Sequence, residues 1–444
     1  MPLRDLSPHD QRLFRQYGHG PAVPLPDPLV HHAVERHATE APHTVAAEHL
    51  GGTITYGELN RYADALAVRL AREGVRPGDH VGLFVRRSIP MLVGLLGILK
   101  TGATHVPQDI GLAPRTRLAH VIHAAGTRVV LTVEQHAHRV PLPAGHRLIA
   151  LDGPLPPAPR HGTPRPRVSP DAGCHILFGS ASVSGSDSGP AARPHGTKVT
   201  HRNLATLLLT GPRGLGIRAG DRVAQLLDLA SATAAWEILG CLAHGGTLVI
   251  GGEDTAAAAR TADVLVATPA VLSGLDPAAC PRLRTVAVVG EAGAPCPRPL
   301  ADRWARRAGL LHCWAPTGTP ATATPHRHDP AAPFPSLGRP TPNNTVYVLD
   351  PDRRPLPIGE TGELWTGGDC VPSDPRAHDD IGDIDGLGTG HYAPDPFLGG
   401  GRRMARTRIL GRWTPDGELE HLGHADAPAP LAHTAQAALH LTVS

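Results

Sequence analysis

The chain has 444 residues, of which 41% are hydrophobic, and this fits about two to four folded units with substantial cores. Its formal net charge of +2 argues against a strongly charged partner, and no basic block suggests nucleic-acid binding. The polar N-terminus lacks the apolar core of a signal peptide, and the longest apolar run, near residues 91–99, is too short for a membrane span. We therefore expect a cytoplasmic protein.

Few side chains offer metal or redox chemistry. The six cysteines are scattered without CxxC spacing, so we expect buried, reduced thiols. The 28 histidines form loose clusters without an HExxH or paired motif, so we expect no metal site. Among 42 lysines and arginines, only Lys100 and Lys198 are lysines. Chemistry that needs a mobile ammonium group must use one of these two.

The first third of the chain alternates between helices and strands. Residues 1–45 form a linker-like segment that is Pro-rich and then carries a short helical pattern. An amphipathic helix is expected at residues 56–73, where Gly74 ends it, and a buried strand follows at residues 80–85. A helix ending at Gly102, a helix at 117–125 and a strand at 128–133 come next. This alternation predicts a parallel α/β sheet.

The sequence pattern changes twice in the rest of the chain. A Pro-rich connector and the Gly- and Ser-rich stretch FGSASVSGSDSGPAARPHGTKVTHRNL precede a second run of helix and strand patterns. From about residue 334 the pattern becomes short strands, an irregular loop over residues 369–402 and a final hairpin. The sequence therefore predicts an α/β core of two subdomains over residues 46–333, a β-rich subdomain over 334–426 and a residual tail over 427–444.

Eight segments in register resemble motifs of one family, the amino-acid adenylation domains of nonribosomal peptide synthetases. They are ITYGELN, LKTGATHVPQD, TKVTHRNL, AAWEILGCLAHGGTLVI, VVGEA, WAPTG, IGETGELWTGG and GRWTPDGELEHLGHAD. The resemblance implies an acyl-adenylate-forming fold, with two α/β subdomains and a small distorted β-barrel. It also implies ATP-dependent activation of an amino acid, then transfer to the phosphopantetheine thiol of a carrier protein. The family's mobile C-terminal subdomain would be missing here.

The family's phosphate loop, TSGSTGxPKG, is altered in this sequence. The corresponding stretch is about eight residues longer, which spoils the convergence of N–H groups that holds a phosphate unless the extra residues loop out. His195 replaces the lysine, while Lys198 aligns with a variable position and could serve a rebuilt loop. We expect a displaced or disordered relic over residues 180–195. Its vestigial residues are Ser180, Ser182, Ser184, His195 and Lys198.

The substrate and nucleotide positions depart from the family as well. Ala232 replaces the aspartate that holds the substrate ammonium group, although Asp228 could substitute. Gly318 replaces the Mg²⁺ glutamate and Ile409 the ribose aspartate, whereas Trp314 could still stack on a base. The vestigial pocket comprises Ala232, Trp236, Cys313 and Ala321, which could equally be core filler. The vestigial nucleotide site comprises Gly290, Glu291, Ala292, Trp314, Thr317, Gly318 and Ile409, and the hinge aspartate persists as Asp426.

These departures together favour a catalytically inactive adenylation-like domain with a structural or docking role. In this hypothesis no catalytic residue, metal or cofactor is expected, whereas active relatives use ATP and Mg²⁺. The expected partners are a carrier protein loaded by another adenylation domain, neighbouring synthetase domains and an MbtH-like accessory protein, with no nucleic acid and no membrane. One alternative is an active enzyme with an unusual acyl substrate and a separately supplied C-terminal subdomain. Another alternative is that the vestigial substrate pocket has an unrelated binding role.

Overall fold

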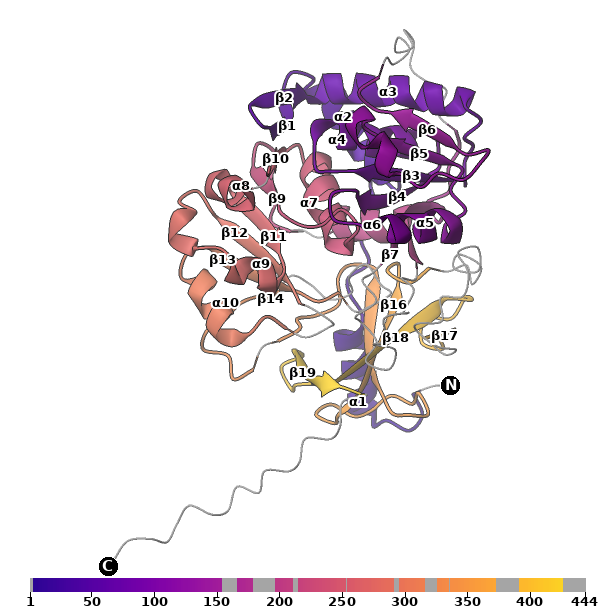
Figure 1. Cartoon of the computed structure of the whole chain (residues 1–444). Helices are drawn as coiled ribbons and strands as arrows, with labels where there is room; N and C mark the ends of the chain where they lie inside the picture. The colour runs from indigo at the N-terminus through magenta and orange to yellow at the C-terminus, as the bar shows by residue number, and fades with distance from the viewer. Residues whose placement is uncertain are drawn as a thin grey trace, which may run out of the picture.

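The computed structural model describes residues 3–153, 166–178, 196–210, 215–252, 254–290, 295–315, 326–334, 336–372 and 391–425. These residues form three sheets, two of them with helices packed around them, and a third, smaller sheet below (Figure 1). The predicted α/β architecture with a β-rich subdomain is confirmed. No helix in the described ranges combines the length and apolar character needed to cross a membrane.

The first sheet has six strands in the order β6-β5-β3-β4-β7-β8, parallel except for the antiparallel pair β7 and β8. Its strands are β3 (His80–Val85), β4 (Thr104–Asp109), β5 (Val129–Thr132), β6 (Arg147–Ala150), β7 (Gly173–Phe178) and β8 (Gly196–Thr200). The helices that belong with this sheet are α3 (Tyr56–Arg72), α4 (Ile89–Lys100), α5 (Arg115–Ala124) and the 3₁₀ helix η1 (Glu134–Arg139).

Local sequence explains where these helices begin. Thr55 and Glu58 form a reciprocal capping box at the start of α3, which satisfies two backbone N–H groups that have no partner inside the helix. Ser88 caps α4, whose residues from Met91 onward are all buried. A helix that is apolar all round must lie inside the protein, and α4 packs against α3 and the sheet.

The second sheet has eight strands in the order β14-β13-β12-β11-β9-β10-β1-β2. Its strands are β1 (Val45–His49), β2 (Gly52–Thr55), β9 (Arg222–Gln225), β10 (Thr247–Ile250), β11 (Val264–Ala267), β12 (Thr285–Val289), β13 (Gly309–Cys313) and β14 (His326–Arg327). The helices of this part of the fold are α2 (Val30–Glu40), α6 (His201–Leu209), α7 (Ala232–Ala243), α8 (Thr255–Thr261), α9 (Pro269–Ser273), η2 (Pro277–Ala279) and α10 (Arg298–Ala305).

The third sheet is antiparallel, with the order β15-β16-β18-β17 and with β19 paired to β18. Its strands are β15 (Asn344–Leu349), β16 (Gly362–Gly368), β17 (Tyr392–Pro394), β18 (Arg403–Trp413) and β19 (Leu419–His424). Strand β17 lies in a stretch that we expected to be irregular throughout, and that expectation was wrong for residues 392–394. Their backbone pairs with β18, a partner that local sequence does not reveal.

The segment that we expected to be linker-like, residues 1–45, contains two helices. Helix α1 (Pro8–Gly18) is capped by Ser7 and lies behind the third sheet in Figure 1, where it contacts β15. Its Phe14 ring stacks on Tyr347 of β15 at 5.4 Å. Helix α2 packs against α3 and α7. The segment therefore contributes to the packing of all three parts of the fold.

Lys100, at the end of α4, is the centre of a buried polar cluster. Its Nζ atom lies 2.5 Å from Glu35 Oε1 of α2, 2.8 Å from Asn60 Oδ1 and 2.9 Å from Asp64 Oδ1 of α3. These three contacts match the three hydrogens of an ammonium group, so the charge is compensated where the side chain is only 6% exposed. One of the two lysines in the chain thus joins three helices.

Candidate functional site

The candidate site lies where strands of the first and second sheets end close together. Arg117 donates to Gln108 Oε1 at 2.9 Å and to the carbonyl of Phe178, the last residue of β7, at 2.6 Å. Arg87, which follows β3, donates to the carbonyl of Leu226 beyond β9 at 2.7 Å. In open α/β sheets ligands usually bind outside the carboxyl ends of the strands, and this is such an edge.

The residues that would form the phosphate loop, Ser180, Ser182, Ser184 and His195, lie outside the described residues. Lys198 is described and lies on β8, paired with Ile176 of β7. Its Cδ atom is 3.3 Å from the position that a Cβ on Gly173 would occupy. Gly173 begins β7 and Phe178 ends it, about 16 Å away at the usual rise per residue. The Lys198 stem thus runs towards the end of β7 that is remote from the loop.

The TKVTHRNL segment forms a strand-to-helix junction. Thr200 caps α6, and its hydroxyl accepts a hydrogen bond from the Asn203 N–H at 3.1 Å. The Asn203 side-chain oxygen accepts a hydrogen bond from the Thr200 N–H at 2.9 Å. The Asn203 side-chain nitrogen donates to the carbonyl of Asp369 at 2.6 Å. This motif therefore ties the first sheet to the loop that follows the third sheet's β16.

The substrate positions are occupied by small or apolar groups in the core. Ala232 is the first residue of α7, and Ser231 caps the helix. Trp236 is 1% exposed and Cys313 is 4% exposed, and both belong to the main apolar cluster that Ala232 packs against. Burial raises the pKa of the Cys313 thiol to about 12. Ala321 lies outside the described residues.

Two carboxylates near the start of α7 have local structural roles. Asp228, which we considered as a substitute for the missing substrate aspartate, is exposed, and its Oδ1 accepts from the Ala230 N–H at 3.0 Å. Glu237 is fully buried, and its Oε1 accepts from the backbone N–H groups of Leu226 at 2.9 Å and Leu227 at 3.2 Å. Burial raises the pKa of Glu237 to about 8, although both hydrogen bonds act in the opposite direction.

At the nucleotide positions the side chains are packed against each other. Ile409 of β18 is 2% exposed and Trp314 is also 2% exposed. Both belong to one buried apolar cluster that includes Leu337 of the segment before β15 and Leu364 of β16. The indole Nε1 of Trp314 has no hydrogen-bond partner among the described residues. Glu291, Ala292, Thr317, Gly318 and the hinge residue Asp426 lie outside the described residues.

The described residues beside Gly290 enclose a cavity much smaller than a nucleoside. Gly290, His312 and Trp314 line a cavity of about 10 Å³, which is room for about one water molecule. The resemblance would place the ribose at Ile409, whose apolar side chain cannot accept a hydrogen bond from a hydroxyl group. We therefore derive no chemical step through ATP at this position.

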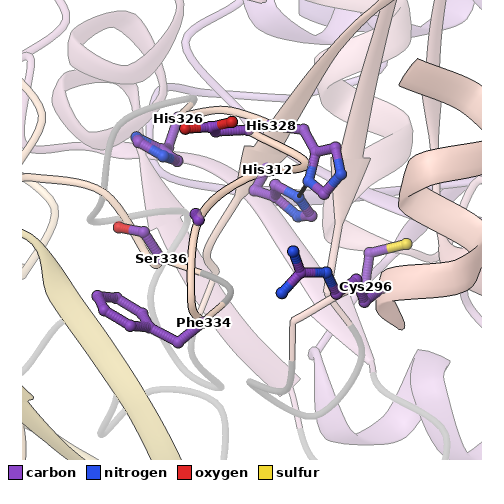
Figure 2. Close-up of a pocket in the computed structure, with 9 residues that line it drawn as sticks. Cys296, His312, His326, His328, Phe334 and Ser336 are labelled. Carbon is purple, nitrogen blue, oxygen red and sulfur yellow. Dashed lines mark hydrogen bonds between the residues drawn. The ribbon is translucent and has the colours of Figure 1, made fainter. Parts of the chain in front are cut away.

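A histidine relay adjoins this small cavity. His312 of β13 lines both it and a second small pocket, which Cys296 and Ser336 also line (Figure 2). His312 Nε2 lies 3.0 Å from His328 Nδ1, drawn as a dashed line in Figure 2, and His328 Nε2 lies 2.7 Å from Asp302 Oδ1 of α10. The three side chains form a continuous hydrogen-bonded chain, Asp302–His328–His312.

The relay determines which ring nitrogens carry protons. Burial, with the neighbouring His328, lowers the pKa of His312 to about 4, so this ring is neutral at neutral pH. The Asp302 carboxylate accepts from His328 Nε2–H, so a neutral His328 must accept at Nδ1 from His312 Nε2–H. His312 Nδ1 is then an acceptor. If His328 is protonated, the direction reverses and His312 Nδ1 becomes a donor.

Sequence reasoning does not identify Arg117, Asp302 or His328 as site residues. The sequence signal is weak, because HRH at residues 326–328 is only a loose cluster and Arg117 falls within a predicted helix. Their partners come from distant segments, as in the contact between Arg117 and Phe178. In the described ranges, no three His, Cys, Asp or Glu side chains converge as a metal site requires.

Comparisons with known proteins agree with this architecture. The AMP-binding enzyme family profile matches residues 34–373. Adenylate-forming reductase 03009 of Coprinopsis cinerea is 38% identical over 433 residues, which cover 96% of this chain and 40% of the reductase. Phosphinothricin tripeptide synthetase PhsB of Streptomyces viridochromogenes is 33% identical over 399 residues, with 86% of this chain and 32% of PhsB covered. Novobiocin biosynthesis protein H of Streptomyces niveus is 30% identical, with 91% of this chain and 68% of that protein covered.

Solved structures give the same result. The nonribosomal peptide synthetase FmoA3, in a form bound to alpha-methyl-L-serine-AMP, superposes with a TM-score of 0.79 and 25% identity, covering 95% of this chain and 47% of FmoA3. The N-terminal subdomain of Klebsiella oxytoca NpsA superposes with a TM-score of 0.73 at 22% identity, covering 89% of this chain and 99% of that subdomain. At 22% identity, the similarity to NpsA supports the fold alone.

Proposed function

Because the chain belongs to the AMP-binding enzyme family, we propose that it is an adenylation-like domain that has kept the family's scaffold and lost its catalytic activity. The domain would act inside a larger synthetase, by spacing or docking its neighbours. The chain spans 40% of the length of the reductase relative and 32% of PhsB, so the activities of those whole proteins are not carried over here.

The observation that carries this proposal is the packing of Ile409. The resemblance implies an aspartate at this position, with both carboxylate oxygens on the ribose hydroxyls. In this chain the side chain is 2% exposed and belongs to the same apolar cluster as Trp314. Restoring a ligand there would require this cluster to open. The residue that replaces the expected aspartate is thus packed into the core, and the substitution is not an isolated change at the surface.

The two lysines support the same proposal. Lys100 is held between Glu35, Asn60 and Asp64, and the Lys198 stem runs along β7 away from the loop position. A phosphate loop normally receives one lysine ammonium group as a point charge. Arginine could supply a charge, but its planar guanidinium does not replace a lysine at such a site without other changes.

The proposed partners follow from the family. A carrier protein whose phosphopantetheine thiol is loaded by a separate adenylation domain is the first, and the neighbouring domains of the same synthetase are the second. An MbtH-like accessory protein stays a prediction from the resemblance. Relatives such as PhsB are much longer than this chain, which supports a setting among other domains.

The second candidate function is that of an active adenylating domain with an unusual acyl substrate. One observation favours it: two relatives at 38% identity are adenylate-forming reductases that match 96% of this chain. Such a domain would use the longer loop and a separate subdomain to complete the site. Loss of the substrate aspartate at Ala232 is compatible with an acid that carries no ammonium group.

ATP–pyrophosphate exchange on the longest natural protein that contains this domain separates the two candidates. The assay would use a panel of amino acids and aryl acids, with a family member of known activity as positive control, and calorimetry would measure Mg·ATP binding. Our proposal expects exchange at background and no detectable binding. Exchange above background with any acid would overturn it and favour the adenylating enzyme.

A further inference from the structure

A groove between α1 and the loop after β17 has the size of a small-molecule site. Its volume is about 360 Å³, in contrast to the cavities of about 10 Å³ near Gly290 and beside His326. Sites for small organic ligands usually fall between about 300 and 1,000 Å³. The groove therefore has room for a ligand with an aromatic ring system, whereas the described nucleotide positions do not.

The inner wall of the groove is aromatic. Phe14 of α1 is 3% exposed, and its ring centroid lies 5.0 Å from that of Phe397 and 6.3 Å from that of His19. All three side chains line the groove. Phe14 also stacks on Tyr347, which fixes the wall to the third sheet. A flat apolar ligand could thus be placed against the partly exposed ring of Phe397, which the buried Phe14 supports.

The rim of the groove carries positive charge. Arg4 and Arg15 line it and are exposed, and neither guanidinium makes a hydrogen bond or ion pair with the described residues. Asp395, whose charge acts on His19, is itself satisfied: its oxygens accept from Tyr347 Oη at 3.1 Å and from the N–H groups of Phe397 and Leu398 at 2.8 and 3.0 Å. These donors are neutral groups, and neither Arg4 nor Arg15 is among them.

The buried edge of the groove offers a polar atom as well. His19 Nδ1 is buried without a hydrogen-bond partner among the described residues, and burial lowers the pKa of this ring, although backbone groups of Arg15 and Phe14 act the other way. A neutral imidazole can accept or donate at that atom. The groove therefore combines an aromatic wall, one unsatisfied polar atom and two arginines that are available to an anion.

We propose that this groove is a binding site for a small organic acid with an aromatic body, held by its ring against Phe397 and by its carboxylate at Arg15 and Arg4. Guanidinium groups match the geometry of a carboxylate, and the rings bury the apolar part of the ligand. The site is independent of the proposed function, since none of its lining residues belongs to the family's nucleotide or substrate positions.

The test uses 1-naphthoate and its neutral isostere 1-naphthamide as probes of the whole chain, with binding followed by calorimetry and ligand-observed NMR. We expect saturable binding of naphthoate and a dissociation constant at least about five-fold weaker for the amide, because only the acid pairs with arginine. The variant R15E should weaken naphthoate binding by about ten-fold or more. R12E is the matched control, because Arg12 lies on the same helix, is exposed and contacts His9 outside the groove.

The proposal is overturned if naphthoate shows no saturable binding, if the amide binds as tightly as the acid, or if R15E and R12E behave alike. R15Q provides a second variant without charge reversal, and R4Q reports on the other arginine. Circular dichroism would establish that each variant is folded, which is expected for substitutions at exposed positions.

Discussion

Two buried regions of this molecule differ in that one contains a paired charge and the other is built of apolar side chains. Between α2, α3 and α4, a lysine ammonium group is buried with two carboxylates and an amide, and each of its three hydrogens has an acceptor. Around Ile409 and Trp314, at positions where the family would place a ligand and its carboxylate, the cluster is apolar. Among the described residues, a charge is retained where it joins helices of the scaffold, whereas Ile409 and Trp314 pack on apolar side chains.

The physical reason lies in the cost of an unpaired buried charge. A charged group that serves a ligand must stay unpaired and partly hydrated until the ligand binds, and this destabilises the fold. When ligand binding is no longer needed, an apolar replacement improves packing. A charge with partners inside the fold cannot be exchanged so simply, because its removal leaves the partners uncompensated.

Removing Lys100 should have the largest effect on stability. K100M leaves the Glu35 and Asp64 carboxylates facing each other with no cation, and we expect a loss of about 3–5 kcal/mol in the free energy of unfolding. Urea denaturation measures this loss. R12M, at an exposed position on α1, is the control and should change stability by less than about 0.5 kcal/mol. Equal stability of the two variants would contradict the comparison.

Placing a carboxylate at Ile409 tests the other region. I409D puts an acid into the apolar cluster, and we expect a loss of about 2–4 kcal/mol in unfolding free energy, against about 1 kcal/mol for I409V. Burial would raise the pKa of this new carboxyl, so the loss should grow as pH rises above the unfolded-state value near 4. Denaturation at two pH values measures it. A stable I409D protein that binds Mg·ATP would reverse our interpretation of this region.

Glu237 lies between these two cases, because it is buried and bound only to backbone N–H groups in the part of the chain that the structure describes. Its folded pKa of about 8 exceeds the ordinary value of 4.5, so the unfolded chain loses its proton first as pH rises. The stability of the unmodified protein relative to E237Q, which cannot ionise at this position, should therefore fall by about 2 kcal/mol from pH 5 to 7. Taking this difference removes the contributions of buried histidines such as His312, which both proteins share. A difference that does not change with pH would show that the carboxylate is ionised in the fold.

The histidine relay should give the smallest change in stability and the clearest spectroscopic change. With His328 neutral, ¹⁵N NMR of His312 should show the Nε2–H tautomer. D302N replaces an obligate acceptor with an amide that can accept or donate, so we expect both tautomers and a stability change of about 1 kcal/mol or less. D329N changes an exposed carboxylate that lines the same pocket and should leave the tautomer unaltered. An unchanged His312 spectrum in D302N would show that Asp302 does not direct the relay.

Much of the fold was predictable because its signals are local. The capping box at Thr55 and Glu58 marks the start of α3, and the apolar run of α4 marks a buried helix. The helix predicted at residues 56–73 is observed at Tyr56–Arg72. In contrast, β1 joins β10 some two hundred residues away, and β17 pairs with β18, and no local pattern specifies either partner.

Residue identity within recognisable motifs is enough to establish the family and the substitutions at Ala232 and Ile409. The surroundings of these positions depend on three-dimensional packing, as in the apolar cluster at Ile409 and the core packing of Trp236. The three acceptors of Lys100 likewise come together only in the folded chain. The same holds for Asp302, His328 and the groove beside α1. Their contacts join segments that are far apart along the chain, and such contacts exist only once the long-range packing has formed.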